Sequence, residues 1–163
     1  NRDDLLIILD ALSELGPNFG LLITKSNADD GGRLLNREIE NFVSKQENAI
    51  AYNALGQFLY YNCIYHFDCV VGNSSSGLFE VPSFKKPTIN IGDRQKGRIK
   101  SKSVFDTNVD KKQIINSIRT SLEIDLNDVK NPYGEGKSSE KIIELLENID
   151  IEKIPLQKHF YNL

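Results

Sequence analysis

Hydrophobic residues along this chain follow two alternating patterns, one with helical spacing and one in short continuous runs. Apolar residues three and four positions apart predict an amphipathic helix, whereas a short apolar run bounded by turn residues predicts a buried strand. The expected helices are 2–15, 33–45, 55–65, a short one carrying Glu80, 111–122 and about 138–146. The expected strands are 20–24, 49–52, 70–71, 88–91 and one near 104–105. This alternation predicts an α/β fold in which helices cover both faces of a parallel sheet.

The third expected helix, 55–65, is rich in aromatic residues. Phe58, Tyr61 and Tyr65 recur at spacings of three and four, which puts them on one face. An aromatic stripe of this kind is more often part of the core than of a cofactor site, so we expect these side chains to be buried.

Length and charge narrow the classes of function. The chain has 163 residues, enough for one domain, and a net charge of −3, which does not favour nucleic acid or an acidic membrane surface as a partner. No apolar run approaches the roughly 18 residues of a membrane span. The two cysteines lie in apolar surroundings, as is usual in the reducing cytoplasm, and the two histidines are isolated, so we expect neither a metal nor a cofactor. The chain has no methionine and opens on a helix, so we expect a fragment whose parent protein supplies an upstream strand.

The segment 72–80, Gly-Asn-Ser-Ser-Ser-Gly-Leu-Phe-Glu, follows a short apolar run and is expected to open a helix. Such a junction binds anions in parallel α/β folds, because the first amides of a helix have no partner within it. The serine hydroxyls add donors, and Glu80 is placed one turn on to accept hydrogen bonds from ribose hydroxyls. The segment therefore predicts a site for a diphosphate and a ribose. Ordinary helix capping by serine and glycine is the alternative interpretation.

Two further loops follow expected strands. The run 92–98, Gly-Asp-Arg-Gln-Lys-Gly-Arg, places Arg94 and Arg98 where an arginine binds a phosphate or stacks on a base. The loop 27–33 also opens a helix, and it is expected at the same edge of the sheet. We find no nucleophile with a matching base and no metal-ligand spacing, so the sequence indicates binding more clearly than catalysis.

Taken together, these segments resemble the UDP-N-acetylglucosamine 2-epimerases, especially the hydrolysing branch of sialic-acid biosynthesis. The residues that carry the likeness are 27–29, 31–33, 72–77, 80–84, 86–98 and 131–136. The resemblance implies a two-domain, glycosyltransferase-B-like fold, with residues 1–163 as its C-terminal, nucleotide-binding, Rossmann-like domain. It also implies an isomerase chemistry in which UDP is eliminated from the sugar and water is then added, which releases N-acetylmannosamine and UDP.

The resemblance assigns substrate-binding roles by position. Ser74 and Ser75 would bind the UDP phosphates, Glu80 the ribose hydroxyls and Arg94 the nucleotide. Asn27 would lie at the edge of the site, and Gly77 would keep the start of the helix open. The acid and base carboxylates would come from the N-terminal domain, which is absent here, so this chain alone is expected to be inactive. Family members are commonly dimers, which makes a second copy a candidate partner.

Three alternatives remain open at this point. The parent enzyme would act in the same way on another UDP-sugar, such as UDP-N,N′-diacetylbacillosamine. The chain would be the nucleotide-binding half of a glycosyltransferase of the same fold. It would otherwise be a UDP-binding module with no catalytic role.

Overall fold

The computed structural model describes residues 1–26, 30–134 and 136–150. The chain divides into two units, one from Asn1 to Tyr133 and one from Gly134 onward. The first contains α1 (Arg2–Glu14), β1 (Leu21–Thr24), α2 (Asp30–Val43), β2 (Ala49–Tyr52), α3 (Gly56–His66), β3 (Val70–Gly72), α4 (Ser76–Phe79), the 3-10 helix η1 (Val81–Phe84), β4 (Thr88–Ile91), β5 (Val104–Thr107) and α5 (Lys111–Ser121). The second contains α6 (Ser138–Asn148), whose apolar residues are all exposed. Apart from one helix, the predicted elements are therefore confirmed, with bounds that differ by at most three residues. The short helix expected to carry Glu80 is instead two short helices, α4 and η1, and Glu80 lies between them as the C-cap of α4.

Local chemistry explains where the two core helices begin. Asn1 caps α1, because its side-chain oxygen accepts a hydrogen bond from the amide of Asp4 at 2.9 Å. Asp110 caps α5 in the same way, accepting from the amide of Gln113 at 2.9 Å. Each cap satisfies an amide that has no partner inside its helix.

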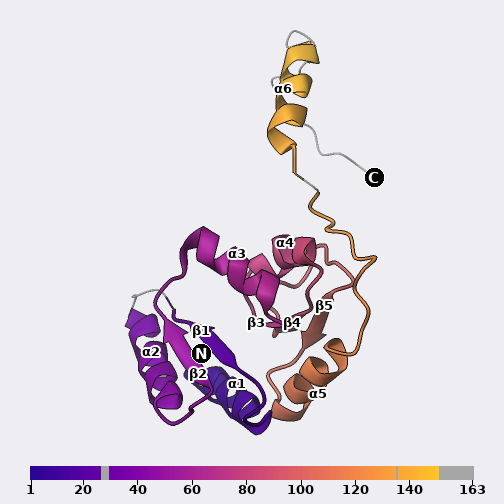
Figure 1. Cartoon of the computed structure of the whole chain (residues 1–163). Helices are drawn as coiled ribbons and strands as arrows, with labels where there is room; N and C mark the ends of the chain where they lie inside the picture. Colours follow the sequence, from indigo (N-terminus) through magenta and orange to yellow (C-terminus); the bar gives the residue numbers. More distant parts are fainter. Residues whose placement is uncertain (27–29, 135, 151–163) are drawn as a thin grey trace. The chain divides into compact units, whose positions relative to one another are not determined.

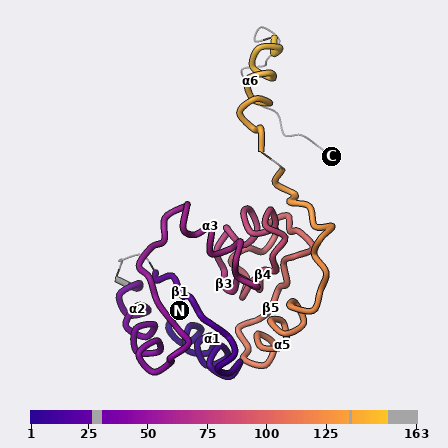
Figure 2. Tube along the Cα trace, viewed as in Figure 1, coloured from indigo at the N-terminus to yellow at the C-terminus, as the bar shows by residue number. Residues whose placement is uncertain are grey.

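The strands pair in parallel throughout, as expected, but they form two sheets. β1 pairs with β2, while β4 lies between β3 and β5. The chain passes from the first sheet to the second through α3 (Figure 2). Since both sheets are parallel, the loops that follow their strands gather at the carboxyl edges, where ligands bind in this class of fold.

The main core lies around β4, which is buried along its whole length. α1 and α5 pack against one another and cover one face, and α3 and α4 lie on the other (Figure 1). The buried cluster consists of Ala11, Leu15, Ile89, Ile91, Ile114, Ile115 and Ile118. Its members come from two helices and the central strand, so the second sheet is the better-anchored part of the fold.

The prediction for the aromatic face of α3 is largely wrong. Phe58 is 83% exposed and Tyr65 is 66% exposed. Helical spacing identified a common face, but spacing alone does not say whether another element covers it. Tyr61 instead lies against Phe84, with the ring centroids 5.5 Å apart, and next to Glu80.

Candidate functional site

The serine-rich loop links β3 to a helix of a single turn. β3 ends at Gly72, and α4 spans Ser76–Phe79, with Ser75 as its N-cap. Ser75 makes no side-chain capping bond, whereas Ser74 Oγ accepts weakly from the amide of Ser76 at 3.4 Å. A helix of one turn has a small dipole, so any anion selectivity of this loop depends on its hydroxyls and its place at the strand end.

Two tyrosines of α3 form hydrogen bonds with residues at the two ends of α4. The hydroxyl of Tyr61 donates to Glu80 Oε1 at 2.8 Å, and the hydroxyl of Tyr60 is hydrogen-bonded to Ser76 Oγ. Burial raises the pKa of Tyr60 above its ordinary value, despite the opposing bond to Ser76. Tyr60 therefore stays protonated near neutral pH, and Tyr61 holds one oxygen of Glu80 in place. Sequence reasoning missed both roles, because the partners lie 16 and 19 positions away.

Gly77 is buried on the core side of α4. A Cβ atom at this position would lie 2.6 Å from Thr88 Cγ2, which is closer than real Cβ contacts allow. The hydroxyl of Thr88 donates to the carbonyl of Gly77 at 3.0 Å. The structure thus gives Gly77 a packing role against β4, while the predicted role at the ligand stays a prediction.

Beneath the loop, Asn73 is held by two residues of the segment that follows β4. Arg94 Nη1 donates to Asn73 Oδ1 at 3.4 Å, and Gln95 Nε2 donates to the carbonyl of Asn73 at 2.7 Å. Gln95 is buried, and Arg94 is exposed. Within the described parts of the chain, Asn90 Oδ1 and Gln95 Oε1 are buried acceptors without a donor. The predicted arginine thus lies beside the serine loop, and a buried glutamine that sequence reasoning missed fixes the loop's backbone.

The loop opens on a cavity of about 800 Å³, and two of the predicted site residues, Ser74 and Glu80, line it. Ser74, Ser76 and Glu80 line it, together with Tyr60 and Tyr61. Apolar residues of α1, β1, α3 and β3 form the rest of its wall. Among the predicted site residues, Ser75, Gly77 and Arg94 do not line the cavity. Asn27 lies outside the described residues.

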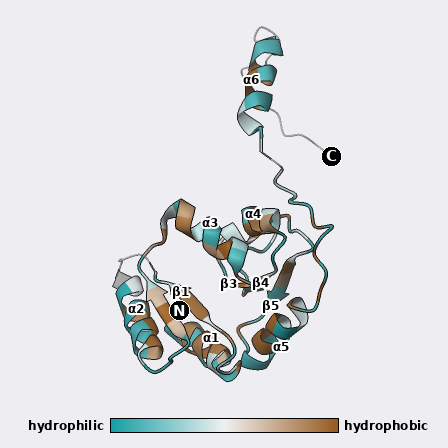
Figure 3. Cartoon of the chain, viewed as in Figure 1, coloured by the Kyte–Doolittle hydropathy of each residue, from teal (hydrophilic) through white to brown (hydrophobic). Residues whose placement is uncertain are grey.

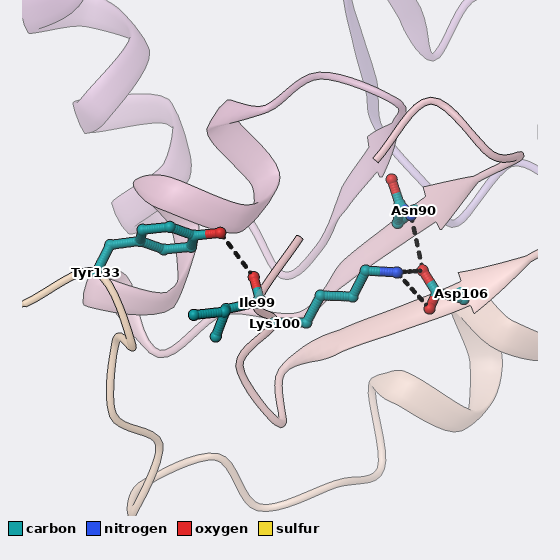
Figure 4. A network of polar contacts seen from close by, with 5 residues as sticks. All are labelled: Asn90, Ile99, Lys100, Asp106 and Tyr133. Carbon is teal, nitrogen blue, oxygen red and sulfur yellow. Dashed lines mark hydrogen bonds and ion pairs between the residues drawn. The ribbon is translucent and has the colours of Figure 1, made fainter. Parts of the chain in front are cut away.

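A second, polar cavity of about 250 Å³ lies at the carboxyl ends of β4 and β5. There Lys100 Nζ bonds both oxygens of Asp106, at 2.8 and 2.6 Å, and Asn90 Nδ2 donates to Asp106 Oδ1 at 2.7 Å (Figure 4). Burial raises the pKa of Asp106, but the bonds from Lys100 and Asn90 outweigh it and hold the pKa below its ordinary value. The same figure shows the hydroxyl of Tyr133 donating to the carbonyl of Ile99, a bond of 2.9 Å. This hydrogen bond holds the segment that precedes β5.

Neither a metal centre nor a membrane span is found in the described residues. No three histidine, cysteine, aspartate or glutamate side chains there are grouped closely enough to hold a metal ion. None of the described helices has the length and apolar character needed to cross a bilayer.

Parallel strands covered by helices define a Rossmann-like α/β fold. The chain belongs to the UDP-N-acetylglucosamine 2-epimerase family, whose model matches residues 1–147. The predicted family is therefore confirmed.

Curated relatives agree with this assignment. GDP/UDP-N,N′-diacetylbacillosamine 2-epimerase (hydrolyzing) of Campylobacter jejuni is 41% identical over 93 residues, which are 56% of this chain and 24% of that protein. UDP-N,N′-diacetylbacillosamine 2-epimerase (hydrolyzing) of Legionella pneumophila is 31% identical over 144 residues, 88% of this chain and 38% of that protein. Polysialic acid biosynthesis protein P7 of Escherichia coli is 32% identical over 167 residues, 99% of this chain and 42% of that protein.

Solved structures agree on the fold. The Methanocaldococcus jannaschii UDP-GlcNAc 2-epimerase, crystallised with UDP-GlcNAc and UDP, matches with a TM-score of 0.73 at 17% identity, over 90% of this chain and 41% of that chain. The Neisseria meningitidis enzyme bound to UDP-GlcNAc matches with a TM-score of 0.68 at 21% identity, over 90% of this chain and 41% of that chain. The chain thus spans less than half the length of these relatives.

Proposed function

We propose that this chain forms the UDP-binding part of a hydrolysing UDP-N-acetylglucosamine 2-epimerase. The observation that carries the proposal is the cavity whose wall includes both Ser74 of the serine loop and Glu80. Membership of the epimerase family supports a nucleotide-sugar as the ligand and disfavours the glycosyltransferase alternative. The parent enzyme would eliminate UDP from the sugar and then add water, and we expect it to work in the cytoplasm.

Each polar group has a task in this scheme. The hydroxyls of Ser74 and Ser75 donate to the diphosphate, and Arg94, held beside the loop through Asn73, adds positive charge. Glu80 accepts hydrogen bonds from the ribose, with its carboxylate oriented by Tyr61. Elimination places negative charge on the departing diphosphate, so preorganised donors at this point stabilise the transition state more than the bound substrate.

The elimination also needs a base for the proton on C2 of the sugar, and later an acid and a water molecule. No residue lining the cavity in the described part of the chain is a histidine, and Glu80 is engaged by Tyr61. We therefore assign the acid and base to an N-terminal domain of the parent protein. The chain alone is expected to bind UDP without turning over a UDP-sugar.

A second candidate substrate is UDP-N,N′-diacetylbacillosamine. Two relatives named for that sugar are 41% and 31% identical to this chain, whereas the Neisseria UDP-N-acetylglucosamine 2-epimerase is 26% identical. The proposed UDP site is common to both substrates, so the sugar would be chosen elsewhere in the parent protein. Supplying the full-length parent with each UDP-sugar and following UDP release separates the two candidates, and no release from either favours a UDP-binding module.

Calorimetric titration of this chain with UDP tests the binding site. Saturable binding is expected, with affinity lost in a Ser75→Ala, Glu80→Ala double variant, because the variant removes a phosphate donor and the ribose acceptor. A Ser44→Ala, Glu123→Ala variant removes the same groups from exposed positions of the same unit, outside the segment 72–80, and should bind normally. Equal UDP affinity in both variants would contradict the proposed site.

A further inference from the structure

Tyr60 of α3 and Ser76 of α4 form a pair of hydroxyls at the wall of the 800 Å³ cavity. Both residues line the cavity, and their side chains are hydrogen-bonded to each other. Each hydroxyl carries one proton, and the bond between them uses only one of the two. Among the contacts of the described residues, the other proton has no acceptor. The pair therefore has one hydrogen-bond donor left over.

The chemistry of the two hydroxyls decides which of them keeps the free proton. A phenol is a stronger acid than an aliphatic alcohol, so Tyr60 is the better donor and the oxygen of Ser76 the better acceptor. Burial raises the pKa of Tyr60, so its hydroxyl is protonated and able to donate near neutral pH. The free proton is then that of Ser76. A hydroxyl that accepts a hydrogen bond is also polarised, which makes it a stronger donor.

Little of the cavity wall can accept this proton. Figure 3 shows β1 and much of α1, which form part of that wall, in the colour of hydrophobic residues. Glu80, one turn further along the chain, accepts the hydroxyl of Tyr61. The carbonyl of Ser76 accepts the amide of Glu80 at 2.9 Å. Because a desolvated donor without an acceptor is costly, a ligand group that only accepts hydrogen bonds is favoured beside Ser76.

Ser76 also lies next to a residue that the proposed site assigns to the diphosphate. Its amide donates to Ser74 Oγ at 3.4 Å, and Ser74 lines the same cavity. Ser75, the other proposed phosphate donor, does not line the cavity, whereas Ser76 does. Phosphate oxygens accept hydrogen bonds and donate none, and their negative charge strengthens each bond that they accept. A diphosphate therefore supplies the kind of acceptor that the free proton lacks.

We propose that Ser76 is a further hydrogen-bond donor to the diphosphate of the ligand, and that Tyr60 is the positioning residue that directs its proton. This inference rests on the proposed UDP site and adds two residues to it. Loss of the Ser76 hydroxyl removes the contact. Loss of the Tyr60 hydroxyl leaves the donor in place but no longer orients or polarises it.

Calorimetric titration of three variants with UDP tests these roles. Ser76→Ala should weaken UDP binding about tenfold or more, because it removes a hydrogen bond to a charged group. Tyr60→Phe should weaken it about three- to fivefold, because the serine donor remains. The double variant should bind no more weakly than Ser76→Ala, because the tyrosine acts only through the serine.

Phosphorus NMR of the bound nucleotide separates this role from a purely structural one. At saturating UDP, one phosphorus resonance should move in Ser76→Ala, and the same resonance should move by less in Tyr60→Phe. A variant that only loosened the fold would lower the affinity and leave the resonances of bound UDP in place. Tyr65→Phe is the matched control, because Tyr65 is 66% exposed on the same helix. It should change neither the affinity nor the resonances.

Three results would overturn the proposal. The first is an unchanged UDP affinity in Ser76→Ala. The second is a larger loss of affinity in Tyr60→Phe than in Ser76→Ala, which would make the tyrosine the direct donor. The third is a loss of affinity with unmoved phosphorus resonances, which would make the pair structural.

Failure of the proposed function would look different. If the unaltered chain does not bind UDP, the UDP site itself is wrong, and the roles of Tyr60 and Ser76 are wrong with it. If UDP binds and its affinity falls only in the Ser75→Ala, Glu80→Ala variant, the site stands and only the inference about Tyr60 and Ser76 is refuted.

Discussion

Replacing Gly77 by alanine should destabilise the protein through one contact. The added Cβ would lie 2.6 Å from Thr88 Cγ2, and Thr88 is 3% exposed at the start of β4, a strand that is buried along its whole length. Overpacking a buried contact is destabilising, so we expect a loss of about 1–3 kcal/mol in the free energy of unfolding. With a urea m-value of about 1–3 kcal/mol/M, the unfolding midpoint should fall by about 1 M.

A double-mutant cycle isolates the contact. Thr88→Ser removes the methyl group that the new Cβ would strike and keeps the hydroxyl that donates to the carbonyl of Gly77. Alone it should cost about 1 kcal/mol for the lost methyl group. In the double variant, the cost should be smaller than the sum by about 1 kcal/mol or more. The assay is urea unfolding followed by circular dichroism.

Additive costs would refute this reasoning, because they would mean that the two side chains do not meet. UDP affinity, measured on the same proteins, separates packing from ligand access. If Gly77 serves packing alone, the double variant recovers both stability and affinity. If the absence of a side chain at Gly77 is also needed for UDP to bind, the double variant recovers its stability but its UDP affinity stays low.

Three further predictions follow from the contacts. Tyr61→Phe should weaken UDP binding about fivefold in calorimetry, because Glu80 loses the hydrogen bond that orients it and such a bond contributes about 1 kcal/mol. Lys100→Met should lower the free energy of unfolding by about 0.2–1 kcal/mol near neutral pH, a range kept small because both partners are partly exposed. Folding lowers the pKa of Asp106, so the stabilisation from this ion pair is present above the ordinary carboxyl pKa near 4. It is lost as the pH falls through the lower pKa of the folded state. The unfolding free energies of the wild-type protein and Lys100→Met should therefore converge in acid. Burial raises the pKa of Cys69 to about 11, so at pH 8 its alkylation in the native protein should be about a hundredfold or more slower than in urea, as followed by mass spectrometry.

Each of these has a control that the chain itself provides. Tyr65 is 66% exposed on the same helix, so Tyr65→Phe should leave UDP affinity unchanged. Asp106→Asn should make stability insensitive to the acid transition assigned to this carboxyl. Unaltered affinity in Tyr61→Phe, a stability difference that persists in acid, or rapid native alkylation of Cys69 would each contradict the corresponding contact.

Local patterns in the sequence determined most of the elements and the class of fold. The helix caps, the apolar strand runs and the serine loop after β3 depend on residues that are close together in the sequence. Their structural consequences can therefore be predicted from the sequence. The parallel arrangement then places the loops after β3 and β4 at one edge, and the structure does bring Arg94 beside Asn73. The family also followed from short motifs in order.

Tertiary structure decided which side chains those motifs meet. Tyr61 and Glu80 are 19 positions apart, and no spacing rule predicts which residues of α3 contact another element. Tyr61 contacts Glu80, whereas Phe58 on the same helix is exposed to solvent. The contact of Gly77 with Thr88 depends in the same way on how closely α4 approaches β4. The division into two sheets depends on which strand edges find a partner, and that is settled by non-local pairing. Packing distances and edge partners are properties of the assembled fold, so the order of residues alone does not reveal them.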